Sequence, residues 1–213
     1  MASETRHQPP VSSVSWQPSL LAAGDDADFD HTLEGARRRF LGHGAWVDHV
    51  PGWVQGADGL FADVLAEAPW QEEQKRPMYD RIVDVPRLTT GGWHEGRPPL
   101  FDRMARCLGR HYGVHLPSIS ANLYRDGNDS VAWHGDRIGR HRVTTIVAIV
   151  SLGSARKLLL RPEGGGASVG YTLHPGDLLV QGGTCQKAFQ HCVPKRAHAG
   201  PRISVMFREL NGN

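Results

Sequence analysis

The stretch VTTIVAIVSL, residues 143–152, consists almost entirely of β-branched and aliphatic residues. This composition predicts a β-strand. Further short strands are predicted at residues 119–125, 157–161, 171–173, 178–181 and 203–207, and turn sequences such as Gly164-Gly165-Gly166 lie between them. Several short strands at close spacing indicate a sandwich or jelly roll rather than a parallel sheet.

The first half of the chain shows a different period. Apolar residues recur at helical spacing in residues 28–40, 57–67 and 100–112, so three helices are predicted there. The third pattern is the clearest, because its apolar residues repeat every four positions and Gly113 is suited to end the helix. With helices first and strands later, the predicted fold class is α+β with a β-core.

Length and composition favour one domain. The chain has 213 residues, and its 24 basic and 22 acidic residues give a net charge of +2, so no overall field demands an anionic partner. Residues 1–17 are rich in Ser, Pro and Gln, which predicts a flexible N-terminal arm before a single domain of residues 18–213. The sequence shows no signal peptide, no membrane span and no disulfide pattern, so we expect a soluble, cytoplasmic protein and a monomer.

The most informative polar feature is His134-Gly135-Asp136. On a β-strand, residues i and i+2 point to the same face, so the His134 imidazole and the Asp136 carboxylate could bind one metal ion. A second histidine would complete the set of two histidines and one carboxylate that leaves open positions on Fe(II). The alternative is a chance pair in a loop, because the chain contains 12 histidines.

His191 is the favoured third ligand. It lies between Phe189 and Val193 at the edge of the predicted β-core, whereas His198 lies in a basic loop. His174 lies in a turn sequence beside Pro175 and is the second choice.

Arg202 and Arg208 lie six residues apart on a predicted strand. This even separation places both guanidinium groups on one face, opposite the apolar residues of that strand. A guanidinium group binds a carboxylate through two parallel hydrogen bonds, so the pair suits a small dicarboxylate. The alternative is an edge strand with two solvated arginines. Asn122 and Tyr124 form a similar pair and could donate hydrogen bonds to the same anion.

These elements, in this order, resemble the AlkB family of Fe(II)- and 2-oxoglutarate-dependent dioxygenases. The resemblance extends over residues 69–208 and rests on the combination of Asn122-Leu123-Tyr124, His134-Gly135-Asp136, His191, and Arg202 with Arg208. It implies a double-stranded β-helix (jelly roll) core with N-terminal flanking helices. Residues 86–89 and 190–195 are most similar to the branch that acts on single-stranded nucleic acid.

The resemblance also implies a role for each matching residue. His134, Asp136 and His191 would bind iron. Arg202 would bind the distal carboxylate of 2-oxoglutarate, and its metal-chelating end would lie near Arg208. Asn122, Tyr124 and Ser204 would also contact this co-substrate. Ser204 replaces the asparagine that is usual in the family, so its hydroxyl has a shorter reach.

The activity implied by the resemblance is oxidative demethylation. With Fe(II), O2 and 2-oxoglutarate, such enzymes hydroxylate an N-methyl group, and the product collapses to release formaldehyde, while 2-oxoglutarate becomes succinate and CO2. The expected substrate is single-stranded DNA with 1-methyladenine or 3-methylcytosine lesions, or alternatively RNA. Arg137 and Ile138 follow Asp136 where many members carry an acidic residue, so base recognition is expected to differ.

Candidate substrate-binding residues lie outside these motifs. Tyr79, Arg87 and Trp93 lie in a segment rich in Pro and Gly that suits a lid, and an aromatic ring there could stack on an unpaired base. Arg137 begins a basic cluster, residues 137–142, and a second cluster occupies residues 195–198. Both clusters are expected to border the same opening and attract phosphates, or alternatively to be solvated loops. Trp70 and Trp133 are predicted core aromatics, and the three cysteines are predicted to be inert.

Two other functions stay open. The first keeps Fe(II) and 2-oxoglutarate but acts on an RNA base, a protein side chain or a small metabolite, since fold and cofactor do not determine the substrate. The second is a jelly-roll binding module for nucleic acid without catalysis.

Overall fold

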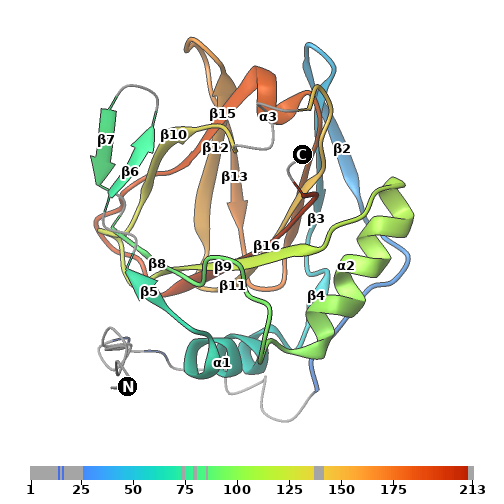
Figure 1. The fold of residues 1–213 in the computed structure, drawn as a ribbon, viewed down its shortest axis with the longest axis vertical. Coiled ribbons are helices and arrows are strands. Elements are labelled where there is room, and N and C mark those ends of the chain that lie inside the picture. Colours follow the sequence, from blue (N-terminus) through green and yellow to red (C-terminus); the bar gives the residue numbers. More distant parts are fainter. Residues whose placement is uncertain are drawn as a thin grey trace, which may run out of the picture.

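The computed structural model describes residues 14, 16, 26–72, 75–78, 81–84, 86–136 and 142–210, with the backbone alone for 75–78 and 81–84. Within these residues, two large antiparallel sheets face each other and form a roll (Figure 1). The predicted α+β class with a double-stranded β-helix core is therefore confirmed.

The major sheet has eight strands and supplies most of the core. In spatial order they are β2 (Arg37–Gly42), β3 (Ala45–Val50), β14 (Leu178–Gly183), β11 (Val147–Gly153), β16 (Arg202–Arg208), β9 (Ser118–Tyr124), β8 (Leu88–Thr89) and β5 (Gln71–Glu72). The central strand β16 pairs along its whole length with both β11 and β9. Both edges of β16 are therefore hydrogen-bonded within the major sheet.

The minor sheet has four strands and closes the other side of the roll. Its spatial order is β10 (Val131–His134), β15 (Phe189–Val193), β12 (Arg156–Pro162) and β13 (Val169–Leu173). Two further pairs stand apart: β1 (Asp28–Phe29) with β4 (Val54–Gln55), and β6 (Lys75–Met78) with β7 (Arg81–Asp84).

The two faces of the major sheet pack against different apolar clusters. On β11, Ala148 and Val150 point to a large apolar cluster that includes the helices, whereas Val147 and Ile149 point to a second cluster shared with the minor sheet. This alternation follows from the two-residue period of a strand. Both faces of β11 are therefore covered, which explains why its sequence is almost continuously apolar.

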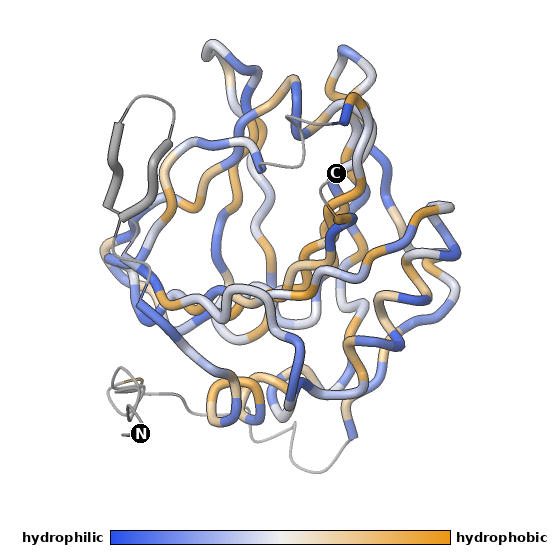
Figure 2. Tube along the Cα trace, in the orientation of Figure 1, coloured by the Kyte–Doolittle hydropathy of each residue, from blue (hydrophilic) through white to orange (hydrophobic). Residues whose placement is uncertain are grey.

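Two longer helices cover the outside of the major sheet (Figure 1). The predicted helix at residues 57–67 is α1 (Ala57–Glu67), which buries Leu60, Phe61 and Val64. The predicted helix at residues 100–112 is α2 (Pro99–Tyr112), which ends at Gly113 with a φ of 68°. Figure 2 shows hydrophobic and hydrophilic residues alternating along α2, as expected for a helix with one buried face. A third, short helix is α3 (Cys185–Ala188).

The helix predicted at residues 28–40 is wrong. This segment contains β1, a turn and most of β2. The Asp30 carboxylate accepts a hydrogen bond from the Thr32 backbone at 2.8 Å, and this local turn competes with a helix. Residues 37–39 are three arginines on the exposed edge of the major sheet, where charged side chains prevent edge-to-edge pairing.

Each strand predicted in the second half is present, with shifted ends. The largest shift is at β11, which begins at Val147 rather than at residue 143. Strands β3, β10 and β15 were not predicted, although β10 and β15 carry both histidines of the candidate metal set.

The predicted N-terminal arm lies outside the described residues, except for Val14 and Trp16. Both are partly buried against the core, and the Trp16 ring lies 4.4 Å from that of Phe61 between centroids. The domain boundary near residue 17 stays a prediction. In the described part of the chain, no helix is long and apolar enough to cross a membrane.

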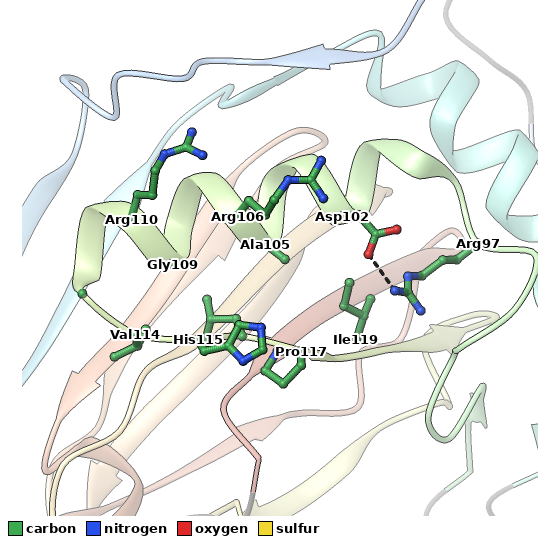
Figure 3. Close-up of a pocket in the computed structure, with 12 residues that line it drawn as sticks. Arg97, Asp102, Ala105, Arg106, Gly109, Arg110, Val114, His115, Pro117 and Ile119 are labelled. Carbon is green, nitrogen blue, oxygen red and sulfur yellow. Dashed lines mark hydrogen bonds and ion pairs between the residues drawn. The ribbon is translucent and has the colours of Figure 1, made fainter.

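A groove of about 740 Å³ lies between α2 and residues 114–119 (Figure 3). Ala105 and Gly109 line it from the helix, and Val114 and Pro117 line it from the following segment. At one end of the groove, Nη2 of Arg97 lies 2.6 Å from Oδ1 of Asp102, and this ion pair neutralises the arginine charge. The lining residues do not include His134, Asp136 or His191.

Candidate metal centre

The fold gathers His134, Asp136 and His191 at one place. Possible ligand atoms of the three side chains all lie within 4.8 Å of one another. His134 ends β10 and is paired in register with His191 on β15, so the two imidazole rings lie 4.3 Å apart between centroids. Asp136 lies just beyond the end of β10, so it reaches the site from a loop rather than from a strand.

Asp136 is held by a charged neighbour. Arg208 donates a hydrogen bond from Nε to Oδ2 of Asp136 at 2.6 Å, and from Nη1 to the Ser120 hydroxyl at 2.9 Å. Burial is the largest single effect and would raise the pKa of the Asp136 carboxyl, but the charge and hydrogen bond of Arg208, together with the neighbouring His191 and His134, outweigh it and lower the pKa below its ordinary range. The carboxylate therefore stays ionised, with Oδ1 oriented toward His134.

Both histidines can present a ring nitrogen to a metal. Burial, reinforced by the adjacent His134, lowers the pKa of His191 to about 3. His134 holds Nδ1 2.8 Å from the Ala132 carbonyl, which leaves Nε2 directed toward Asp136. Ring-nitrogen hydrogen bonds of this kind orient histidine ligands in metal sites.

A second part of the same cavity is rich in arginine. Arg202, at the start of β16, is 1% exposed and donates from Nε to the Ser151 hydroxyl at 3.0 Å. Its Nη2 has no hydrogen-bond partner among the described residues. Burial lowers the pKa of Arg202 to about 10, and the nearby Arg156 and Arg87 act in the same direction. A buried guanidinium with an unused donor is costly, so the site favours a bound anion or another acceptor.

The predicted co-substrate residues surround Arg202. Tyr124 pairs with Arg202 across β9 and β16, and Ser204 pairs with Asn122. The Tyr124 hydroxyl accepts a hydrogen bond from Arg87 at 2.9 Å. One cavity is lined by both sets of polar residues, which are Arg87, Asn122, Tyr124, His134, Asp136, His191, Arg202, Ser204 and Arg208. Its apolar lining was not predicted from the sequence and consists of Val131, Ile149, Leu158, Val193 and Met206.

The four predicted substrate-binding residues have different outcomes in the structure. Arg87 is buried and lines the cavity beside Tyr124, so it does not form part of an exposed lid. Trp93 was predicted to stack on a base, and this is wrong, because the side chain is 1% exposed and packs in the core against Phe101. Tyr79 and Arg137 lie outside the described residues.

The two remaining tryptophan predictions have different outcomes. Trp70 is a core residue, 3% exposed, as predicted. Trp133 is not, because it is only partly buried and the Arg161 guanidinium lies over its ring at 4.2 Å. All three cysteines are free and buried.

Of the two basic clusters, residues 195–198 are exposed. They follow the end of β15 that pairs with the start of β10, and the Arg196 backbone donates to the Gly127 carbonyl at 2.8 Å. Asp136 follows the opposite end of β10, so this cluster lies away from the loop that carries Asp136. In the other cluster, only Arg142 is described, and it pairs with Glu209 at 3.3 Å.

Two buried side chains near the site were not predicted. Arg156 is 1% exposed and donates to the carbonyl oxygens of Asp126, Asp129 and Pro194, so it joins the loops at one end of the cavity. Gln186 accepts a hydrogen bond from the backbone of Asp136. Their sequence neighbourhoods carried no signal, because each contacts residues far away along the chain.

Comparison with known families agrees with this geometry. The family profile described as the 2OG-Fe(II) oxygenase superfamily matches residues 62–208. The chain belongs to this superfamily. The matched segment contains the three clustered side chains and both arginines of β16.

Within the superfamily, this chain is similar to AlkB proteins, as its sequence motifs indicated. The chain is 31% identical to the alpha-ketoglutarate-dependent dioxygenase alkB homolog 3 of Bos taurus over 191 residues, which is 75% of this chain and 64% of that protein. It is 31% identical to the DNA oxidative demethylase ALKBH2 of Arabidopsis thaliana over 146 residues, 57% of this chain and 46% of that protein. The chain thus spans less than two thirds of the length of these relatives.

Solved structures show the same fold. The structure of OsALKBH1 matches 82% of this chain and 100% of its own chain, with a TM-score of 0.56 and 13% sequence identity. At this identity the likeness concerns the fold alone.

The residues of the cavity fit the groups that name the superfamily. Two imidazoles and an ionised carboxylate are the donor set that suits Fe(II) with open positions. The unpaired Nη2 of Arg202 suits one carboxylate of 2-oxoglutarate. The expected cofactors, Fe(II) with 2-oxoglutarate and O2, are therefore confirmed for the family to which the chain belongs.

Proposed function

We propose that the protein is an Fe(II)- and 2-oxoglutarate-dependent dioxygenase that oxidatively removes N-methyl groups from bases in nucleic acid. The observation that carries the proposal is one cavity that holds both the His134, Asp136 and His191 cluster and a buried arginine with an unused donor. Membership of the superfamily and similarity to AlkB proteins support it.

In this proposal, His134, Asp136 and His191 are the iron ligands. Arg208 binds Oδ2 of Asp136 and leaves Oδ1 for the metal. Bound Fe(II) supplies the centre at which O2 and 2-oxoglutarate react. The three side chains would hold Fe(II) and leave coordination positions for O2 and 2-oxoglutarate.

The co-substrate would bind along β16 and β9. Arg202 binds the distal carboxylate through Nη2, and the Tyr124 hydroxyl, oriented by Arg87, lies beside it. Asn122 and Ser204 line the middle, and Arg208 lies near the end that approaches the metal. Arg87 then acts on the co-substrate side of the cavity rather than on the base. The buried position of Arg202 excludes water, which strengthens the ion pair.

The proposed substrate is alkylated nucleic acid, with single-stranded DNA carrying 1-methyladenine or 3-methylcytosine as the first choice. The support is the similarity to relatives named as AlkB homologs and as a DNA oxidative demethylase. The roles of Tyr79 and Arg137 toward the base, a monomeric state and a cytoplasmic location stay predictions.

A product-release panel tests this function. The protein is incubated with Fe(II), ascorbate and 2-oxoglutarate together with methylated single-stranded DNA, methylated RNA or a methylated peptide, and formaldehyde is measured. We expect release with DNA carrying 1-methyladenine or 3-methylcytosine. Release with RNA or peptide alone would reassign the substrate, and 2-oxoglutarate turnover without any of these would favour a small metabolite. Binding of oligonucleotides with neither succinate nor formaldehyde would indicate a non-catalytic module.

A further inference from the structure

The loop that carries Asp136 is tied to α3 by one buried hydrogen bond. The backbone N–H of Asp136 donates to Oε1 of Gln186 at 3.0 Å, although the two residues are 50 positions apart in the sequence. Gln186 is 5% exposed. Asp136 lies beyond the end of β10, so sheet pairing does not place its backbone.

Gln186 is itself held in one orientation. Its Nε2 donates to Oε1 of Gln181 at 2.8 Å, and Gln181 is 1% exposed on β14. A carboxamide that donates on one side must present its oxygen on the other side. The oxygen is therefore directed to the Asp136 backbone by a residue of the major sheet, whereas both histidines lie on the minor sheet.

The backbones of the two segments also meet closely. A Cβ atom at Gly135 would lie 3.0 Å from the backbone oxygen of Gln186, tighter than most such contacts. Strand β15 begins at Phe189, directly after α3, and its third residue is His191. Thus α3 is joined covalently to one proposed ligand and by a hydrogen bond to another.

We infer that Gln186 is a positioning residue that places the Asp136 carboxylate relative to His134 and His191. This inference rests on the proposed function, since it assumes that these three side chains bind the metal. Arg208 orients the carboxylate group, and Gln186 orients the backbone that bears it. Residues that hold metal ligands in place affect metal affinity and coordination geometry, and their loss typically weakens binding by about 10- to 100-fold.

The competing explanation is that Gln186 only satisfies a buried N–H group. In that case its removal would lower stability without changing how a bound metal is coordinated. Metal affinity and the visible absorption spectrum of bound Co(II), which reports ligand geometry, separate the two explanations.

The experiment titrates the full chain and its variants with Co(II) in the absence of O2. Gln186→Met keeps the length of the side chain but removes both hydrogen-bonding groups. Gln190→Met is the matched control, because Gln190 accepts a hydrogen bond from Arg161 and precedes His191 on β15, so its side chain points to the opposite face of that strand. Gln181→Met leaves Oε1 of Gln186 in place but removes its partner, so a smaller effect of the same kind is expected. Thermal unfolding of each variant checks that it is folded.

We expect Gln186→Met to weaken Co(II) binding by about 10- to 100-fold and to change the spectrum at saturating metal, with Gln190→Met within about twofold of the unchanged protein. A folded Gln186→Met with unchanged affinity and spectrum would overturn the inference. If Gln186→Met does not fold, Gln181→Met decides in the same way. Failure of the unchanged protein to bind Co(II) would instead overturn the proposed function, and the inference with it.

Discussion

Arg208 and Asp136 form an ion pair across the roll, with Nε of the arginine 2.6 Å from Oδ2 of the carboxylate. Arg208 ends the central strand of the major sheet, and Asp136 follows the edge strand of the minor sheet. The pair therefore bridges the two sheets at the proposed metal centre. Because both side chains are largely buried, its energetic contribution should be measurable.

A double-mutant cycle on this pair is the first prediction. With metal absent, Arg208→Met and Asp136→Asn should show a coupling of about 1–3 kcal/mol in the free energy of unfolding, because each change leaves the other group buried without its partner. Urea denaturation of the four proteins gives the value. Strictly additive effects would mean that the ion pair does not form in solution.

A second prediction concerns the anion-binding end of the cavity. At about 100 times its dissociation constant, 2-oxoglutarate should stabilise the protein by about 2.7 kcal/mol, which raises the melting temperature by roughly 5–10 °C in a chain of this size. Arg202→Met should abolish the shift, because the buried Nη2 is lost. Arg161→Met, which removes an arginine from the outer face of the minor sheet, should leave it intact. An unchanged shift in Arg202→Met would refute the assignment of Arg202.

The cysteines provide a prediction on pH dependence. Burial raises the pKa of Cys192 to about 11 and that of Cys185 to about 12. Because each pKa is raised, the protonated thiol persists to higher pH, and at pH 8 the Cys192 thiolate should be about 100-fold scarcer than in the unfolded chain. Iodoacetamide should thus label these thiols slowly at pH 8 and rapidly in urea. Rapid labelling of the folded protein would contradict their burial.

Two glycines give opposite predictions for stability. Gly153 has a φ of 77°, and a Cβ there would lie 2.6 Å from both the Phe61 ring and the Pro201 carbonyl, so Gly153→Ala should lose about 2–4 kcal/mol. Gly59 lies in α1 with open space around it, so Gly59→Ala should gain about 0.5–1 kcal/mol. The urea midpoints of the two variants should move in opposite directions, and a shared direction would argue against this packing.

Local patterns in the sequence were sufficient for part of the fold. Helices α1 and α2 were predictable because their apolar residues follow the helical period, and the central strands because they are buried on both faces. Segment 28–40 was mistaken for a helix because its spaced apolar residues resemble one, although a local turn at Asp30 and pairing with β3 determine its structure. Strands β10 and β15 are short and mixed in polarity, so their pairing with each other is not visible in the sequence.

The candidate site was predictable to a similar extent. Alternation along β16 placed Arg202 and Arg208 on one face, and the apolar neighbours of His191 at the edge of the predicted β-core favoured it as the third ligand; all three residues line one cavity. Trp93 was misplaced because an aromatic residue in a segment rich in Gly and Pro gives no sign of whether it is buried. Gln186 could not be found, since its partner Asp136 is brought near only by the complete fold.

The most direct test of the account measures succinate and formaldehyde together in one reaction with a single-stranded oligonucleotide carrying 1-methyladenine. The unchanged protein should release the two products in nearly equal amounts, and Asp136→Ala should release neither, since the proposed metal centre has lost its carboxylate. Equal product formation by Asp136→Ala, or no formaldehyde from the unchanged protein with Fe(II) and 2-oxoglutarate present, would contradict the account.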